Sequence, residues 1–270
     1  MKQLFFTIYF LLTLTSLQSS DFPFQAGERL TFDIHYKYGL VMLKAGTANY
    51  SIESGASQNK NSYHSALDFK TSSFFDKIFR MRDTLNSNIS ENIRPLYHKR
   101  SVHEGNYQFT EEMFFHKSTP EYSEIRIKRV SNQMLRFDTV LTSNMLTYDI
   151  LNLILLIRSY DYSQWQSTPQ RYVSTFVGRD KINITVRCEG QSIVEKGDTL
   201  KYKTYKFAFD FTDKVFNESK SAIEVWLSDD KNRIPIKIRA KLRIGAAEVY
   251  LSSWKNLKYP LSSEIKIPAQ

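Results

Sequence analysis

The sequence has few of the residues that mark a disulfide-stabilised domain or a familiar enzyme. Its one cysteine, Cys188, excludes a disulfide within the chain, so burial of apolar side chains must supply the stability. It contains no GxSxG elbow, HExxH helix, CxxC pair or phosphate-binding loop. Proline and glycine number only 7 and 9, and no stretch rich in them marks a linker. We therefore expect a non-enzymatic protein without a cofactor, folded as a single domain over residues 21–270.

The first twenty residues have the pattern of a secretory signal. Lys2 precedes an apolar run from Leu4 to Leu14, and small and polar residues follow up to Ser20. A membrane anchor is the alternative, but the run is shorter than the roughly 20 apolar residues that cross a bilayer. The cysteine that a bacterial lipoprotein needs after this run is absent. The pattern predicts cleavage of residues 1–20 and export to the periplasm or cell envelope, without a lipid anchor.

Basic residues outnumber acidic ones. The formal net charge is +9, and loss of Lys2 with the signal would leave 37 − 1 = 36 basic residues against 28 acidic ones. Such an excess favours anionic partners, including lipid head groups and acidic envelope polymers, and it suits peripheral contact with a membrane. Export argues against nucleic acid as the partner. The alternative is a soluble protein that is simply basic.

Two long stretches, residues 27–52 and 223–254, alternate apolar and polar side chains with little interruption. Alternation with a period of two is typical of antiparallel strands that bury one face. The 16 tyrosines and 19 phenylalanines suit such strands. The sequence therefore predicts a mostly β protein whose curved antiparallel sheet forms a barrel or half-barrel.

The register of one hairpin can be predicted from its turn. Gly105 and Asn106 form a two-residue loop between strands expected at 97–104 and 107–116. This loop gives three favourable cross-strand pairs: Tyr97 with Phe114, Lys99 with Glu112, and Arg100 with Glu111.

A second hairpin is expected near the C-terminus. A turn at Gly245 and Ala246 sets Arg243 opposite Glu248 and Leu242 opposite Val249. Pro235 cannot donate to the sheet and indicates an edge or bulge where the strand starts. The alternation turns one set of residues inward: Ile234, Ile236, Ile238, Ala240, Leu242 and Ile244.

The opposite face of that last strand carries four basic residues, spaced by about 6 to 7 Å: Lys237, Arg239, Lys241 and Arg243. We predict this row as a candidate binding site for phosphates or carboxylates. The alternative is a solvated outer face that Glu224 and Glu248 partly neutralise.

One segment departs from the alternating pattern. Nearly every residue from Leu146 to Ile157 is apolar, in a run too short to span a bilayer. Asp149 suits a helix N-cap, and Arg158 suits the C-terminal end of the helix dipole. The pattern predicts one helix near residues 146–158 that plugs the open side or end of the sheet, with a buried strand as the alternative.

Other residue groups are better explained by structure than by chemistry. The five histidines have no partners at ligand spacing, so we expect no metal site. Ser228, Asp229 and Asp230 would suit an acid pair or a calcium site, but a tight turn explains them better. Cys188 shares a face with apolar residues and is expected to be buried and inert.

Three motifs resemble the DUF3108 family of exported bacterial proteins of undetermined function. The first runs from Gly27 and Glu28 through Leu30 and Phe32 to Ala45 and Gly46. The second runs from Tyr148 to Arg158, with Asn152 where a serine is usual. The third is Trp226, Ser228 and Asp230, followed by Arg233, Ile234 and Pro235. The resemblance implies a barrel-like antiparallel sheet in the cell envelope, and no established activity.

Two function classes compete on this evidence. The first is a carrier whose sheet and helix enclose an aromatic-lined cavity for a lipid or other amphiphile. The second is an interaction or assembly module that uses a sheet edge and the basic row against envelope polymers or proteins. An envelope hydrolase, the third class, would need His, Ser and Asp or Glu side chains to converge in one cleft. A hollow interior favours the carrier, and a filled interior favours the module.

Overall fold

The structure is a computed structural model that describes residues 22–55, 62–160, 162–165, 170–197, 200–212 and 219–266. The predicted signal at residues 1–20 lies outside these ranges. The described residues form fifteen strands: β1 (Arg29–Tyr38), β2 (Val41–Ser54), β3 (Ser62–Thr71), β4 (Arg82–Ser90), β5 (Pro95–Glu104), β6 (Tyr107–Thr119), β7 (Tyr122–Ser131), β8 (Met134–Ser143), β9 (Gln170–Val177), β10 (Asp180–Lys196), β11 (Leu200–Thr212), β12 (Ser219–Ser228), β13 (Pro235–Lys241), β14 (Ala246–Lys255) and β15 (Glu264–Lys266). Their helices are α1 (Ser73–Asp76), α2 (Ile150–Ser159) and the 3-10 helix η1 (Tyr162–Trp165).

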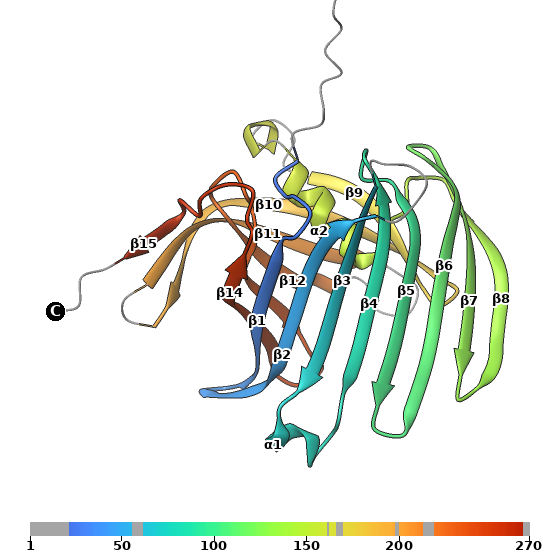
Figure 1. Ribbon diagram of the computed structural model, residues 1–270, viewed down its shortest axis with the longest axis horizontal. Helices are drawn as coiled ribbons and strands as arrows, with labels where there is room; N and C mark the ends of the chain where they lie inside the picture. The colour runs from blue at the N-terminus through green and yellow to red at the C-terminus, as the bar shows by residue number, and fades with distance from the viewer. Residues whose placement is uncertain are drawn as a thin grey trace, which may run out of the picture.

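The strands form one antiparallel sheet that curls into a nearly closed barrel (Figure 1). The order is β8-β7-β6-β5-β4-β3-β2-β1-β14-β13-β12-β11-β10-β9, with β15 beside β11. The first and last parts of the chain meet where β1 pairs with β14. The predicted fold class, a curved antiparallel barrel with one apolar helix, is confirmed.

Side-chain contacts link the two edge strands β8 and β9, and a short bridge links β9 to the segment that follows β8. Ser174 Oγ lies 3.4 Å from Ser143 Oγ and 2.7 Å from Thr147 Oγ1, and Thr147 and Ser174 form an isolated parallel bridge. Phe176 of β9 packs with Met113 of β6 in a small apolar cluster. These contacts bring the sheet edges together, and this closes the barrel without a continuous ladder of hydrogen bonds.

α2 fills one end of the barrel. Asp149 caps it, accepting hydrogen bonds from the backbone N–H groups of Leu151 and Asn152. The helix begins at Ile150, whereas the apolar run begins at Leu146. Thr147 and Tyr148 are not helical because they pair with Ser174 of β9.

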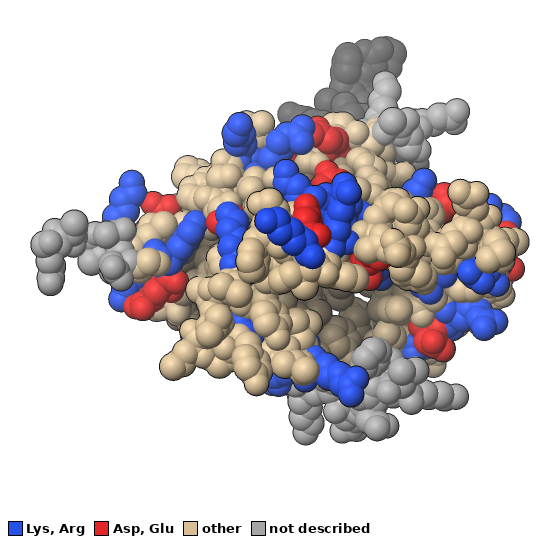
Figure 2. Space-filling model, turned by 90° about the horizontal axis from the view of Figure 1, so that it is seen from below, with Lys and Arg blue, Asp and Glu red and all other residues tan. Residues whose placement is uncertain are grey.

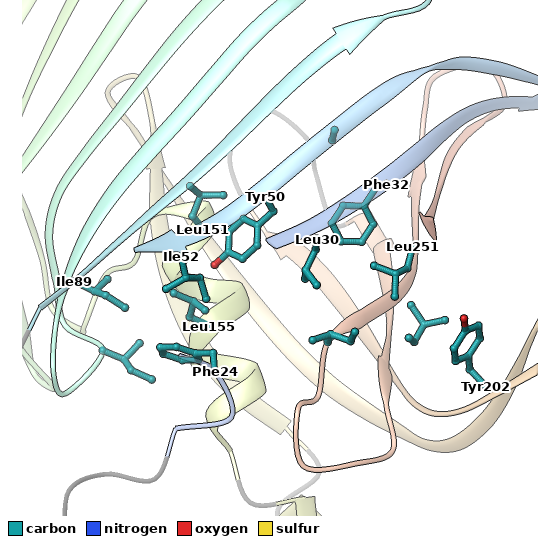
Figure 3. Close-up of a cluster of buried hydrophobic side chains, with 14 of the residues drawn as sticks. Phe24, Leu30, Phe32, Tyr50, Ile52, Ile89, Leu151, Leu155, Tyr202 and Leu251 are labelled. Atoms are coloured by element: carbon teal, nitrogen blue, oxygen red, sulfur yellow. The ribbon is translucent and has the colours of Figure 1, made fainter. Parts of the chain in front are cut away.

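Both faces of α2 are buried, which explains its apolar character all round. Leu151 and Leu155 pack with Phe24, Leu30 and other side chains of the first core cluster (Figure 3). Leu153 and Ile157 pack in a second cluster with residues of β9 to β12. Cys188 borders this second cluster and is only partly buried, and that burial raises the pKa of its thiol.

The register predicted for the hairpin at Gly105 is confirmed. β5 and β6 pair as expected: Tyr97 with Phe114, Lys99 with Glu112, and Arg100 with Glu111. Gly105 has φ +56, which glycine adopts readily. Turn chemistry and cross-strand pairing agreed at this hairpin, and together they fixed the register.

The register predicted for the second hairpin is wrong. Arg239, rather than Arg243, lies opposite Glu248, because β13 ends at Lys241 and a four-residue loop follows. A slip of four residues leaves every side chain on its predicted face, so alternation alone cannot detect it. Leu242 and Ile244, predicted to point inward, lie in this loop and are 47% and 63% exposed.

Candidate functional site

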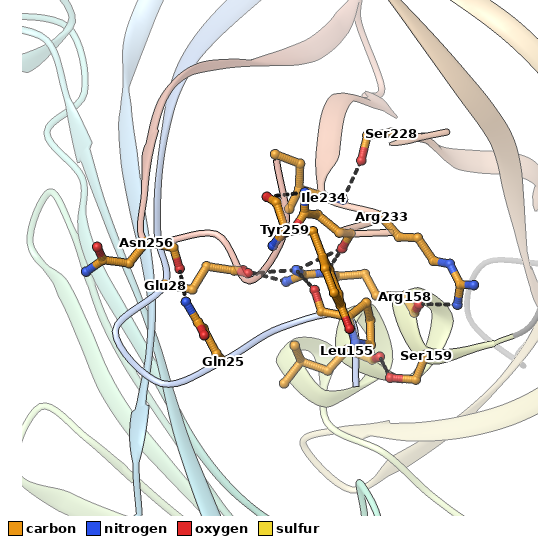
Figure 4. A network of polar contacts seen from close by, with 12 residues as sticks. Gln25, Glu28, Leu155, Arg158, Ser159, Ser228, Arg233, Ile234, Asn256 and Tyr259 are labelled. Carbon is orange, nitrogen blue, oxygen red and sulfur yellow. Dashed lines mark hydrogen bonds and ion pairs between the residues drawn. The ribbon is translucent and has the colours of Figure 1, made fainter. Parts of the chain in front are cut away.

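The C-terminal end of α2 carries a completely buried charge. The side chains of Arg158 and Glu28 have no exposed surface and form a bidentate pair at 2.7 and 2.9 Å. Arg158 also donates to the carbonyls of Asn232 and Pro23. Burial alone would lower the pKa of Arg158, but the Glu28 carboxylate raises it above its ordinary value. The pair ties α2 to the N-terminal segment and to the β12–β13 turn (Figure 4).

The β12–β13 turn is held by its own side chains. Asp230 Oδ1 accepts hydrogen bonds from Ser228 Oγ, Asn232 N and Arg233 N at 2.9, 2.9 and 3.3 Å. Asn232 Nδ2 in turn donates to the Tyr259 carbonyl. These bonds confirm the prediction that Ser228 and Asp230 serve a tight turn.

The other end of the barrel, which we call the hairpin end, carries α1 and the β1–β2, β5–β6, β7–β8, β9–β10 and β13–β14 turns. Between this end and α2 lies a cavity of about 400 Å³. Its lining is apolar with a few charged groups: Asp83, Leu85, His98, Arg100, Glu111, Met113, Asp149, Ile150, Thr175, Phe176, Val177, Ile182, Ile184 and Phe211. The sequence left open whether the interior is hollow or filled. The interior is filled around α2 and hollow beneath it.

Two observations show how the cavity is placed. Ile150, the first residue of α2, is 39% exposed although it lies inside the barrel, because it faces this space. Asp83, Val177 and Phe211 lie within one residue of the strand ends at the hairpin end. The cavity therefore lies beside the hairpin end and away from the buried pair of Glu28 and Arg158.

A histidine and an aspartate of the cavity wall meet a serine that lies behind them. Ser87 Oγ lies 2.7 Å from His98 Nδ1 and donates to Asp149 Oδ1 at 2.7 Å, and all three residues are buried. In a nucleophilic triad, the two ring nitrogens of histidine bridge the serine and the carboxylate. Here the serine hydroxyl donates its hydrogen bond to the carboxylate, and His98 Nδ1 lies 2.7 Å from Ser87 Oγ and 3.4 Å from Asp149 Oδ1, so the same ring nitrogen faces both groups. The arrangement therefore anchors the cap of α2 rather than activating a nucleophile.

Sequence reasoning missed this group of three. Ser87 comes from β4, His98 from β5 and Asp149 from the cap of α2, so no spacing in the chain indicates their contact. The only available signal was the N-cap character of Asp149, and it gave no indication of a partner.

Two arginines bring positive charge to the inner wall of the barrel. Arg129 binds Glu111 at 2.5 and 2.8 Å, so the charge of that carboxylate is balanced. Arg100 lines the cavity with its guanidinium 5.2 Å from the centre of the Phe109 ring. Within the described part of the chain, no carboxylate lies within 4 Å of the Arg100 guanidinium. Arg100 is thus a cation at the cavity that can donate to a ligand.

The predicted basic row is divided between two environments. Lys237 and Arg239 lie on the outer wall, where Lys237 Nζ is 3.4 Å from Glu248 and Arg239 Nη1 is 3.3 Å from Glu224. The ring of Trp226 lies 5.1 Å from Lys237 Nζ. Both carboxylates are nearly buried.

Lys241 and Arg243 lie elsewhere, at the hairpin end. Lys241 is the last residue of β13 and Arg243 belongs to the loop that follows, and both are exposed. The four residues therefore do not form one straight row along a strand. Their role in binding stays a prediction.

We expect Glu248→Gln to lower the free energy of unfolding at pH 7 by about 1 to 2 kcal/mol, since its cationic partners are partly exposed. Burial alone raises the pKa of Glu248, but the Tyr250 hydroxyl, Lys237 and Lys37 outweigh it and lower that pKa. A lowered carboxyl pKa stabilises the fold fully above the unfolded value of about 4.3, and this stabilisation is lost as the pH falls through the folded value. Urea denaturation of both proteins at pH 7 and pH 3 should show the difference shrink at pH 3. An equal difference at both values would contradict this account.

Comparison with known proteins identifies the family. The family model described as "Protein of unknown function (DUF3108)" matches residues 31–252, most of the sequence. The chain belongs to the DUF3108 family. No curated protein matches the sequence. Among solved structures, this DUF3108 chain is similar to a β-barrel-like protein of domain of unknown function DUF1849 from Brucella abortus. The TM-score is 0.56 at 10% identity, over 84% of this chain and 96% of that one, which supports the fold alone.

The DUF3108 motifs meet at the end of the barrel that α2 fills. Glu28 from the first motif binds Arg158 from the second, and Arg158 donates to the carbonyl of Asn232 in the third. Gly46 of the first motif has a different explanation. A Cβ there would lie 2.3 Å from the Lys70 carbonyl of the next strand. In this DUF3108 chain Glu28, Arg158 and Asn232 thus hold the C-terminal end of the helix away from the cavity, whereas Asp149 and Ile150 of the second motif line the cavity.

Proposed function

We propose that this DUF3108 protein is an exported, non-enzymatic binding protein of the cell envelope that carries an amphiphile in the cavity beneath α2. The observation that carries the proposal is the cavity itself, which is mostly apolar and has a few charged groups in its wall. Small barrels that hold one apolar ligand have interiors of this kind.

The size of the cavity narrows the ligand class. A volume of about 400 Å³ lies in the lower part of the range of roughly 300 to 1,000 Å³ that is typical of pockets for one small ligand. This suits a single acyl chain or a compact ring system better than a two-chain phospholipid. Leu85, Met113 and Phe176 would contact the apolar part.

Arg100 is the group best placed to bind a polar head. Glu111 is balanced by Arg129, and the oxygens of Asp149 already accept bonds from Ser87, the backbone and Asn152. A guanidinium offers a fork of donors that fits a carboxylate or a phosphate. We therefore expect the ligand to have an acceptor-bearing head group.

Titration of the delipidated protein with a fluorescent fatty acid, cis-parinaric acid, tests this proposal. We expect saturable binding, and a roughly tenfold weaker affinity in Arg100→Gln because a charge-assisted hydrogen bond is lost. Lys99→Gln is the matched control, since it removes the same charge from the opposite face of β5 and should bind as the parent does. Absence of saturable binding would reject the carrier. Equal binding by the parent and Arg100→Gln would reject only the role of Arg100.

A further inference from the structure

Exposed apolar residues gather at the hairpin end of the barrel. In the described part of the chain, 19 large apolar residues are exposed. Five of them lie away from the hairpin end: Leu96, Val140, Ile150, Tyr172 and Ile193. The remaining 19 − 5 = 14 lie in or beside the turns of the hairpin end, or in the α1 segment. An apolar surface concentrated in this way marks an interaction site.

The β1–β2 hairpin is the most prominent of these features. It bends outward at the lower end of the sheet (Figure 1), and its tip residues Tyr38, Leu40 and Val41 are 61%, 104% and 56% exposed. The β13–β14 loop lies beside it, because Tyr36 Oη donates to the Ile244 carbonyl. Ile244 therefore extends the same apolar surface.

Basic residues surround the apolar ones at this end. The exposed cations include Lys70, Lys77, Arg80, Lys241 and Arg243. Of the acidic residues, Asp76 of α1 is paired with Arg82, and Asp180 is exposed next to the exposed Arg179. Figure 2, which views this end from below, shows more Lys and Arg than Asp and Glu among the uncharged residues, with a hollow near the centre. The charge of this surface is complementary to an anionic partner.

We infer that the hairpin end docks on a lipid bilayer that contains anionic lipids. The apolar tip would enter the boundary between head groups and acyl chains, and the basic residues would contact lipid phosphates. The apolar residues are spread over separate turns around the cavity, which fits a broad surface better than one peptide. None of the helices in the described residues is long and apolar enough to span a membrane. Docking would place the cavity next to the bilayer, and it does not depend on what the cavity binds.

Co-sedimentation of the purified protein with vesicles tests the inference. We expect binding to phosphatidylcholine vesicles that contain phosphatidylglycerol, and much weaker binding to phosphatidylcholine alone. Leu40→Asp/Val41→Asp should weaken binding about tenfold or more, since each apolar side chain loses its burial. Lys241→Glu/Arg243→Glu should weaken it by about fivefold per residue. Ile193→Asp, at a 52% exposed position distant from the hairpin end, is the matched control and should bind as the parent does.

Each other outcome overturns the inference. Failure to bind the anionic vesicles rejects docking, and so does binding that the tip variant retains. The surface would instead belong to a second copy of the chain if two results were found together. The parent would self-associate in analytical ultracentrifugation without vesicles, in a way that the tip variant Leu40→Asp/Val41→Asp abolishes, and it would not bind vesicles. The cis-parinaric acid titration of the tip variant separates this result from the carrier proposal, because its cavity is unchanged.

Discussion

Replacing Arg158 with methionine is expected to lower the free energy of unfolding by about 3 to 5 kcal/mol. The side chain has no exposed surface, and its removal would leave the Glu28 carboxylate buried without its counter-charge. The carbonyl of Asn232 would also lose a donor. Urea denaturation of both proteins measures the difference.

The double variant Glu28→Leu/Arg158→Met separates lost pairing from lost packing. Replacing both members of a buried ion pair by apolar residues is often neutral or stabilising, so the double variant should be clearly more stable than Arg158→Met alone. Arg126→Met is a control, because its pair with Asp138 is partly exposed and should contribute less than about 1 kcal/mol. If the double variant were as unstable as the single one, packing rather than charge pairing would explain the loss.

Filling the cavity is expected to weaken amphiphile binding by about two orders of magnitude or more, with little change in stability. Leu85 on β4 and Thr175 on β9 face the cavity from its two walls, and both are partly exposed there. Tryptophan at both positions would exclude several methylene groups of a ligand. At about 0.8 kcal/mol for each buried methylene, loss of four weakens binding about two-hundredfold. The cis-parinaric acid titration measures this loss.

Val140→Trp is the matched control for that variant, because Val140 is 53% exposed on β8 and does not line the cavity. It should bind the probe as the parent does. Thermal unfolding followed by circular dichroism shows whether the double tryptophan variant is folded, and Thr175→Trp alone is the milder alternative. Unchanged affinity in a folded double variant would place the ligand elsewhere.

Much of the fold was predictable because it depends on local patterns. Alternation identified the strands around Leu30 and Ile236, and the apolar run after Asp149 identified the helix with its cap. The β5–β6 register was predictable because the Gly105 turn and three side-chain pairs agreed. The β13–β14 register was not predictable, because a four-residue slip keeps every side chain on the same face. A contact with a distant strand distinguishes the two registers, and it is made at Gly245. A Cβ at Gly245 would lie 2.4 Å from the Lys37 carbonyl of β1.

The candidate site was less predictable, because it depends on contacts between distant segments. Arg158 was interpreted as a charge at the end of a helix, whereas its main partner, Glu28, is 130 residues away. The cavity results from the path of α2, which fills only one end of the barrel, and no residue pattern encodes that volume. The exposed apolar tip at Leu40 also escaped notice, because alternation predicts faces of a sheet and says nothing about its turns.

Native mass spectrometry of the protein, purified from its own cells without detergent, tests the central claim most directly. We predict a population whose mass exceeds that of the chain by one small amphiphile, and the same preparation of the double tryptophan variant should lack it. A parent protein found only at the mass of the bare chain, or a variant that still carries the added mass, would contradict the claim that the space beneath α2 holds a ligand.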